Sequence, residues 1–460
     1  MNAFTVKQTC ERQEFGLANQ ETLEQQLDSF DPTERAAALA ELAGMGLPTA
    51  APSDNLNMHF HSFFSYNAEG WSPSRIAWEA RKAGLYSAGL CDFDVLDGLD
   101  EFLRAGELLG LRATVNLETR SFVKEYADLE LTSPGEPGVT YIMGGGFARE
   151  LPAGSAPAAG LAGYRDAARS RNLALIDRVN PNVPTIALDY AADVLPLTPK
   201  GVATERHIIR AYINKSHAVY GTREAVIAFW SELLGKAPAA IDAILDSPDL
   251  DEAVRTKLAK KGGFGYVQPS EDTFPLIDDF MAWVASCGAV PMITWLDGTS
   301  PGESDGRALL ECLMAKGGAA LNIVPDRNWN ISDPDKRAVK VANLRAIVQA
   351  ADDLGLPVNI GTEMNKAGLP FVDDLDGEVL REFKASFVRG ARIMVGHSIV
   401  ARYTERSYAT CECDLATKNR VFESIGALPP LTAPVAAKLR DMEGEAAFAA
   451  IKDAAGKGSW

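Results

Sequence analysis

Short apolar runs alternate with amphipathic stretches in two parts of the chain, which are separated by a long segment without this rhythm. Each short run predicts a buried strand, and the stretches between the runs predict helices. Strands are expected at residues 56–60, 86–90, 112–117, 290–294, 319–324, 357–360 and 392–395. Strand–helix alternation favours a parallel sheet, so these seven strands predict an α/β barrel.

The interruption divides the chain into five segments. Residues 55–120 and 276–400 carry the alternation and are expected to form the two parts of the barrel. Residues 121–275 begin with proline- and glycine-rich loops and continue with helical stretches. They predict a mainly helical insertion that acts as a lid and selects the substrate. Residues 1–54 and 401–460 are expected to be helical extensions.

Composition and charge narrow the classes of partner. The 460 residues include 45 basic and 62 acidic side chains, so the formal net charge is −17. Nucleic-acid affinity rests on Lys and Arg, so this balance argues against a nucleic-acid partner. The most apolar segment, 280–296, is short for a membrane span and contains Gly288 and Pro291. We expect a cytoplasmic protein with a small-molecule substrate, because the start lacks a secretory signal and the six cysteines are scattered. The oligomeric state stays open.

Polar side chains follow the ends of all seven expected strands. Active sites of α/β barrels lie at the carboxyl ends of the strands, and strand residues i and i+2 point to the same side. Imidazole and carboxylate together suit Zn, Mn or Fe rather than Ca or Mg. The chain has only five histidines, and two of them stand as His59-Phe60-His61. In strand order the candidates are His59 and His61, Asp92 and Asp94, Glu118, Asp297, Asp326 and Arg327, Glu363 and Asn365, and His397.

Four segments of the sequence resemble the polymerase and histidinol phosphatase (PHP) superfamily. NMHFHS (57–62), CDFDVLDG (91–98) and NLE (116–118) are similar to its motifs D-L-H-x-H-S, T-D-H-D-x-x-x-G and G-x-E. ERHIIR (205–210) is similar to the R-P-H-I-A-R element of the branch that acts on nucleotide phosphates, where it also lies in a helical insertion. The resemblance covers about residues 55–400 and marks the chain as a divergent member.

The resemblance implies a distorted seven-stranded (β/α)7 barrel and hydrolysis of phosphate esters with two or three metal ions. It implies that His59, His61, Glu118 and Glu363 form a first metal site. Glu118 would bridge to a second ion held by His207. Glu363 would replace the Asp of a late G-S-D-x-H motif, which reads GTEMN (361–365) here.

Several positions depart from the family pattern. Phe93 and Asn365 stand where the family has histidine, and the Asp of an early S-D-G motif is missing. We therefore expect the third metal site to be absent or rebuilt, and one or two divalent transition-metal ions to be bound. Asp297 is the candidate substitute for a second-site histidine.

The remaining candidates have chemical roles and plainer alternatives. His397 is a candidate replacement ligand or proton donor, and Asp92 a candidate catalytic residue that could instead cap a helix. Arg327 is expected to offset phosphate charge at the strand ends, and Arg206, Arg210 and Lys215 to do so from the insertion. Each of these cations could instead be solvated or salt-bridged, and His207 could be a surface residue. The pair Cys411-x-Cys413 has no partner pair with zinc-finger spacing.

Three functions are compatible with this pattern. The first is a metal-dependent phosphoesterase that acts on a small phosphorylated metabolite. The second is a degenerate barrel that binds a metal or metabolite without hydrolysis, which the lost histidines favour. The third is a metal-dependent hydrolase or lyase that acts on a non-phosphate substrate. Loss of turnover in His59→Ala and Glu118→Gln would separate the first from the second.

Overall fold

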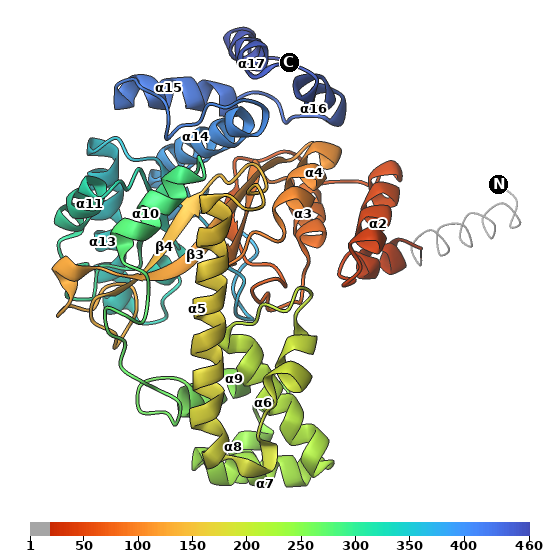
Figure 1. Ribbon diagram of the computed structural model, residues 1–460, viewed down its shortest axis with the longest axis vertical. Helices are drawn as coiled ribbons and strands as arrows, with labels where there is room; N and C mark the ends of the chain where they lie inside the picture. Colours follow the sequence, from red (N-terminus) through yellow and green to blue (C-terminus); the bar gives the residue numbers. More distant parts are fainter. Residues whose placement is uncertain (1–18) are drawn as a thin grey trace, which may run out of the picture.

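A seven-stranded sheet forms the centre of the molecule, whose computed structural model describes residues 19–460 (Figure 1). The strands lie in the sheet in chain order. They are β1 (Leu56–Phe60), β2 (Ser87–Phe93), β3 (Arg112–Phe122), β4 (Val139–Gly145), β5 (Val290–Trp295), β6 (Ala320–Ile323) and β7 (Val358–Ile360). All neighbouring strands pair in parallel except β4, which is antiparallel to both β3 and β5.

The segment after β7 returns to β1 and nearly closes the sheet. Glu363 forms a parallel bridge with Phe60, in which Glu363 N donates to His59 O at 2.8 Å and His61 N donates to Glu363 O at 2.9 Å. The predicted α/β barrel with seven strands is therefore confirmed.

One predicted strand is wrong. Residues 392–395 lie inside helix α14 (Lys384–Tyr403), and the seventh strand is β4, within the segment that the sequence assigned to the insertion. The error has a physical cause: α14 is buried on most of its faces, so its apolar run lacks the one-sided periodicity that marks a surface helix. A 3₁₀ turn, Leu380–Glu382, precedes α14.

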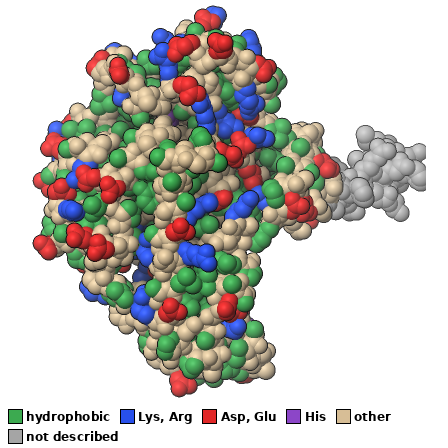
Figure 2. Space-filling view, in the orientation of Figure 1, with side chains coloured by type: hydrophobic (Ala, Val, Ile, Leu, Met, Phe, Trp, Pro, Cys, Tyr) green, Lys and Arg blue, Asp and Glu red, His purple; other side chains and the backbone are tan. Residues whose placement is uncertain are grey.

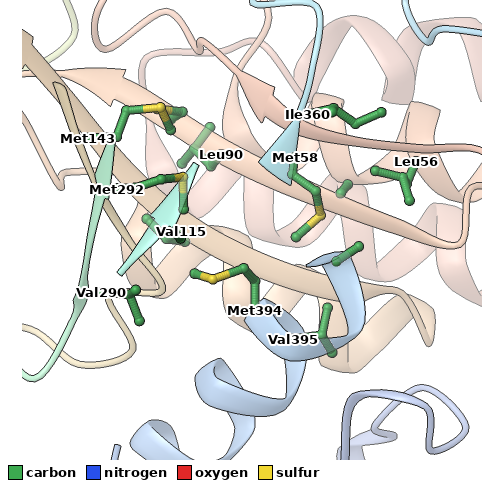
Figure 3. Close-up of a cluster of buried hydrophobic side chains, with 14 of the residues drawn as sticks. Leu56, Met58, Leu90, Val115, Met143, Val290, Met292, Ile360, Met394 and Val395 are labelled. Carbon is green, nitrogen blue, oxygen red and sulfur yellow. The ribbon is translucent and has the colours of Figure 1, made fainter. Parts of the chain in front are cut away.

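The barrel interior is filled with apolar side chains from alternate strand positions. Met58, Leu90, Val115 and Met292 are at most 1% exposed, and Met394 of α14 reaches them from one end (Figure 3). This is the end at which the parallel strands begin, because α14 packs its Gly390 directly against the backbone of Val358 at the start of β7. The opposite end, where the parallel strands finish, is free to carry a site.

Helices surround the sheet, and further helices precede and follow the barrel in the chain. Around the barrel lie α3 (Pro73–Lys82), α4 (Leu99–Leu109), α10 (Ile277–Ser286), α11 (Gly306–Ala315), α12 (Asp326–Trp329) and α13 (Pro334–Asp353). Before β1 comes α2 (Pro32–Gly44), and after α14 come α15 (Leu415–Gly426), α16 (Ala433–Arg440) and α17 (Gly444–Lys457). Within residues 19–460, none of the helices has the length and apolarity needed to cross a bilayer.

The insertion has a hydrophobic core of its own. It consists mainly of α5 (Ala156–Val179), α6 (Glu205–Tyr220), α7 (Arg223–Leu234), α8 (Pro238–Asp242) and α9 (Pro248–Leu258). Tyr212, Trp230 and Val254 are fully buried in this core. The long helix α5 connects the two bodies (Figure 1): its Tyr164 ring packs against Phe280 and Trp283 of α10, and its last turns join the insertion core.

Candidate metal centre

Three buried side chains converge at the mouth of the barrel: His59 and His61 at the carboxyl end of β1, and Glu118 inside β3, level with the end of β2. Glu118 Oε2 lies 3.8 Å from His59 Nε2 and 3.4 Å from His61 Nε2. One ligand atom of each residue lies within 4.8 Å of the other two, so the group could hold a metal ion. His59 and His61 meet because residues two apart at a strand end project to the same side.

The chemistry of this group fits a divalent transition metal. His59 Nε2 and His61 Nε2 are both buried and have no hydrogen-bond partner in the described structure. Buried polar atoms are nearly always paired, so two unpaired nitrogens beside one carboxylate require an explanation. Two imidazoles and a carboxylate with an open position are the donor set of many catalytic zinc sites. A bound cation would satisfy both nitrogens and the carboxylate together.

Hydrogen bonds behind His61 fix which nitrogen faces the centre. The Asp92 carboxylate accepts hydrogen bonds from Ser62 N, Ser62 Oγ and Ser65 Oγ, each at 2.7 Å. Because the Ser65 hydroxyl proton goes to Asp92, Ser65 Oγ accepts from His61 Nδ1 at 3.0 Å. Nδ1 then carries the proton and Nε2 presents its lone pair to the centre. Asp92 therefore helps to hold the His61 ring in position, and it does not itself line the cavity above the centre.

The charges of the three residues stabilise one another. Burial raises the pKa of the Glu118 carboxyl, but the adjacent imidazoles of His59 and His61 outweigh burial and hold that pKa low. Burial lowers the pKa of His59, but Glu118 and Glu363 reverse the effect and raise it. On the far side of the His59 ring, Nδ1 contacts the side-chain amide of Asn322 at 3.3 Å.

Two further candidate ligands are already paired with cations. Glu363 Oε2 lies 2.8 Å from Arg327 Nη2, and Asp297 Oδ2 lies 2.7 Å from Lys340 Nζ. Neither carboxylate belongs to the three-residue group. Glu363 still lies beside that group, since its backbone bridges to His59 and His61. The charge of Glu363 raises the pKa of Arg327, so the guanidinium stays charged.

The other two candidate histidines have structural partners. His207 Nδ1 accepts from Thr204 N at 3.1 Å and so caps α6, and burial lowers its pKa to about 4. The sequence predicts that His397 follows the end of a strand, but His397 lies within α14. The premise for its predicted role at the barrel mouth is therefore wrong. Its Nε2 donates to Gly146 O at 3.0 Å and its Nδ1 accepts from Tyr408 N at 3.1 Å. Both ring nitrogens of His397 are thereby occupied.

A cavity of about 740 Å³ lies over the centre, between the barrel mouth and the insertion. Its wall contains eight basic and five acidic side chains, and Glu118 and Glu363 are two of these five. His61 also lines it. Its wall therefore has three more basic than acidic groups, in a chain with a net charge of −17. The basic residues are Arg120, Arg171, Arg178, Arg206, Arg255, Lys260, Lys261 and Arg327. Lys and Arg side chains gather where the insertion meets the barrel (Figure 2). The cavity suits an anionic ligand.

Only one of the three expected insertion cations lines this cavity. Arg206 does so, and it pairs with Glu252 at 3.0 Å. Arg210 pairs with Asp251 at 2.8 Å and Lys215 with Asp193 at 2.9 Å, and neither lines the cavity.

The structure adds cations that the sequence analysis missed. Arg120 and Arg171 lie over the same Phe274 ring, 4.3 and 4.9 Å from its centroid. Arg120 had a usable signal, because it lies two residues beyond Glu118 on the same face of β3. Arg171 lies on α5, and no local pattern indicates that this part of the helix faces the barrel mouth.

Unusual backbone geometry is concentrated at this mouth. Among residues 19–460, the non-glycine residues with positive φ are Tyr66 (110°), Asp94 (61°), Glu363 (66°) and Met364 (52°). Tyr66, Asp94 and Glu363 line the cavity. Such conformations cost free energy and cluster at functional sites, which supports a functional role for this end of the barrel.

Comparisons with known proteins give only distant likenesses. No protein-family model matches the sequence, and no curated protein matches it. The fold is similar to a protein of Bifidobacterium adolescentis provisionally named a metal-dependent phosphoesterase, with 19% identity, 74% of this chain and 98% of that chain covered, and a TM-score of 0.45. It is also similar to an amidohydrolase from Chromobacterium violaceum, solved with sulfate and no metal, with 17% identity, 72% and 96% covered, and a TM-score of 0.46. Neither likeness identifies the reaction of this chain.

Proposed function

We propose that this chain is a metal-dependent phosphoesterase of the PHP type that hydrolyses a small phosphorylated metabolite. One observation carries the proposal: two unpaired imidazole nitrogens face Glu118, and Glu118 and one of the two histidines, His61, line a basic cavity. The floor supplies metal ligands, and the wall supplies the positive charge that a phosphate ester needs.

Each part of the site has a role in this proposal. His59, His61 and Glu118 hold a divalent Zn, Mn or Fe ion. Such an ion supplies Lewis-acid activation of water and of a phosphoryl oxygen. Arg327 and Arg120 offset the charge of the phosphate in the cavity. The insertion covers the mouth and excludes bulk water, which strengthens these electrostatic interactions.

The donor set favours one ion. Glu363 and Asp297 are neutralised by Arg327 and Lys340, and His207 caps a helix. A second ion would need Glu363 to leave Arg327.

A binding protein without hydrolytic activity is the second candidate. Phe93 and Asn365 line the cavity at positions where the PHP family has histidine. The apolar and amide side chains there favour ligand binding over catalysis.

The test joins metal analysis with a phosphate-release panel. The full chain, purified without chelators, is analysed for metals beside His59→Ala, Glu118→Gln and the control His217→Ala, whose histidine is exposed on α6. Phosphate release from a panel of esters is then measured with Mn, Zn or Fe(II).

We expect about one ion per chain and metal-dependent turnover in the wild type and His217→Ala. His59→Ala should lose both the bound ion and the turnover, and Glu118→Gln should lose the turnover. Metal bound without turnover on any ester would favour the binding protein. Metal-dependent cleavage of other bonds only would favour a non-phosphate hydrolase or lyase. Absence of metal in every preparation would overturn the centre itself.

A further inference from the structure

Two thiols lie side by side on the loop that joins α14 to α15. Cys411 Sγ and Cys413 Sγ are 2.8 Å apart, and both residues are partly exposed. The other cysteines of the described residues lie elsewhere: Cys91 is buried, Cys287 follows α10, and Cys312 lies on α11. The loop therefore holds a thiol pair that is open to solvent reagents and outside the metal centre.

The geometry of this pair is close to that of a disulfide. A disulfide needs Cα atoms about 4.4–6.8 Å apart, and residues two apart in the chain are never separated by more than about 7 Å. The two sulfurs already point toward each other, so bond formation needs only a small local movement. The hydrogen bond to Cys411 and local burial outweigh the charge of nearby Lys418 and raise the pKa of the Cys413 thiol, so the reactive thiolate forms more readily as the pH rises.

We propose that Cys411 and Cys413 are a redox site that forms a reversible intramolecular disulfide. With a peroxide as oxidant, one thiolate attacks a peroxide oxygen to give a sulfenic acid and releases the other oxygen as water. The second thiol then attacks the sulfenic sulfur, forms the S–S bond and releases a second water. The two thiols lose two electrons and two protons, and one hydrogen peroxide becomes two water molecules. A dithiol reductant reverses the reaction by thiol–disulfide exchange.

The loop connects the outer helices to the barrel. Tyr408 N donates to His397 of α14, and Tyr408 Oη donates to Asn419 of α15 at 2.6 Å. The Tyr408 ring also packs on Phe422 of α15 at 5.3 Å. A disulfide three residues beyond Tyr408 would restrain the segment that holds α15 against α14. Oxidation is expected to slow amide hydrogen exchange in residues 407–415.

Peptide mass spectrometry of the full chain tests the proposal. Trypsin cleavage after Arg406 and Lys418 releases residues 407–418, a peptide that contains both thiols and no other cysteine. The reduced chain is treated with hydrogen peroxide, alkylated and digested, beside Cys411→Ser, Cys413→Ser and the control Cys312→Ser.

In the wild type and Cys312→Ser, the peptide should become lighter by two hydrogens, become resistant to alkylation, and recover with dithiothreitol. Neither single variant of the pair should give this form. Two independently alkylated or oxidised thiols in the wild type would overturn the proposal, as would cross-linked peptides from two chains. Unchanged hydrogen exchange in residues 407–415 of the oxidised chain would overturn the restraint on α15.

Discussion

Arg327 and Glu363 form an ion pair at the mouth of the barrel, with Nη2 2.8 Å from Oε2, directly beside the group of His59, His61 and Glu118. The pair places the Arg327 guanidinium beside the proposed centre, with its charge balanced by Glu363. It also engages the Glu363 carboxylate, which the resemblance to the PHP superfamily implies as a metal ligand. If the proposed function holds, Arg327 would influence both the binding of an anionic substrate and the number of ions that the site can hold.

Arg327→Gln is expected to raise KM for a phosphate ester about tenfold or more, because a hydrogen bond to a charged group contributes about 1.5–3 kcal/mol. It should also strengthen metal binding, since Glu363 loses its counter-ion. Steady-state kinetics and calorimetric metal titration measure the two effects. Arg345→Gln, which removes an exposed arginine that pairs with Glu382, is the control and should change neither. Weaker metal binding in Arg327→Gln would contradict the restraint on Glu363.

Removal of the hydroxyl behind His61 should weaken metal binding without unfolding the chain. Ser65→Ala breaks the connection from Asp92 to His61 Nδ1, so the ring is no longer held with Nε2 toward the centre. Loss of such supporting hydrogen bonds typically costs about 10- to 100-fold in metal affinity. The metal dissociation constant is the measurement, with Ser424→Ala on α15 as the matched serine control. Equal metal affinities of the two variants would show that Asp92 and Ser65 do not support metal binding.

Asp373 should make the stability of the chain depend on pH. Its carboxyl is 1% exposed, accepts from Trp329 Nε1 at 3.0 Å and leaves Oδ2 unpaired, and burial raises its pKa to about 7. The folded pKa lies above the unfolded value of about 3.9, so the protonated form is favoured by folding. Its stabilising contribution is complete below about pH 4 and is lost as the pH rises to about 7.

The variant Asp373→Asn should remove this dependence. The difference in free energy of unfolding between wild type and variant should change by at most about 1.4 kcal/mol per pH unit between pH 4 and 7, and level off above. Urea unfolding at several pH values measures it. Asp374→Asn, an exposed neighbour, serves as the control and should follow the wild type at each pH. A constant difference for Asp373→Asn would show that the carboxyl ionises normally in the fold.

His397 is expected to act on stability and not on the metal. His397→Ala leaves a cavity in a fully buried position and strands Gly146 O and Tyr408 N without partners. We expect a loss of roughly 2–5 kcal/mol in the free energy of unfolding with unchanged metal content at low temperature. Denaturant unfolding and metal analysis, with His217→Ala beside it, provide the measurement. Loss of metal in a folded His397→Ala chain would restore the role expected from the sequence.

The convergence of His59, His61 and Glu118 was predictable because their geometry is local. His59 and His61 lie two apart at a strand end, and Glu118 ends up near them because β1, β2 and β3 are consecutive parallel strands. The ion pairs of Glu363 and Asp297 depend on cations from other elements, Arg327 after β6 and Lys340 on α13. No spacing in the sequence records those contacts.

The remaining errors arise from burial and from long-range packing. The apolar run at 392–395 fits a strand or a buried helix equally well, and only tertiary contacts decide between them. β4 ends in Gly144 and Gly145 within a glycine- and proline-rich segment, so its sequence is typical of a loop. A Cβ at Gly145 would lie 2.5 Å from the terminal methyl of Met292 and 2.7 Å from that of Met394, so these two core side chains would have to shift to accept a larger residue.

The antiparallel strand β4 determines how the chain could be dissected. Excision of residues 121–275 would take β4 out of the sheet and leave the facing edges of β3 and β5 with unpaired backbone groups. Such a truncated chain should aggregate through these edges. A minimal barrel must therefore keep residues 139–145 and shorten the chain only beyond them. By the same reasoning, the accessory helices could have been gained or exchanged during evolution only at junctions that leave this strand in place.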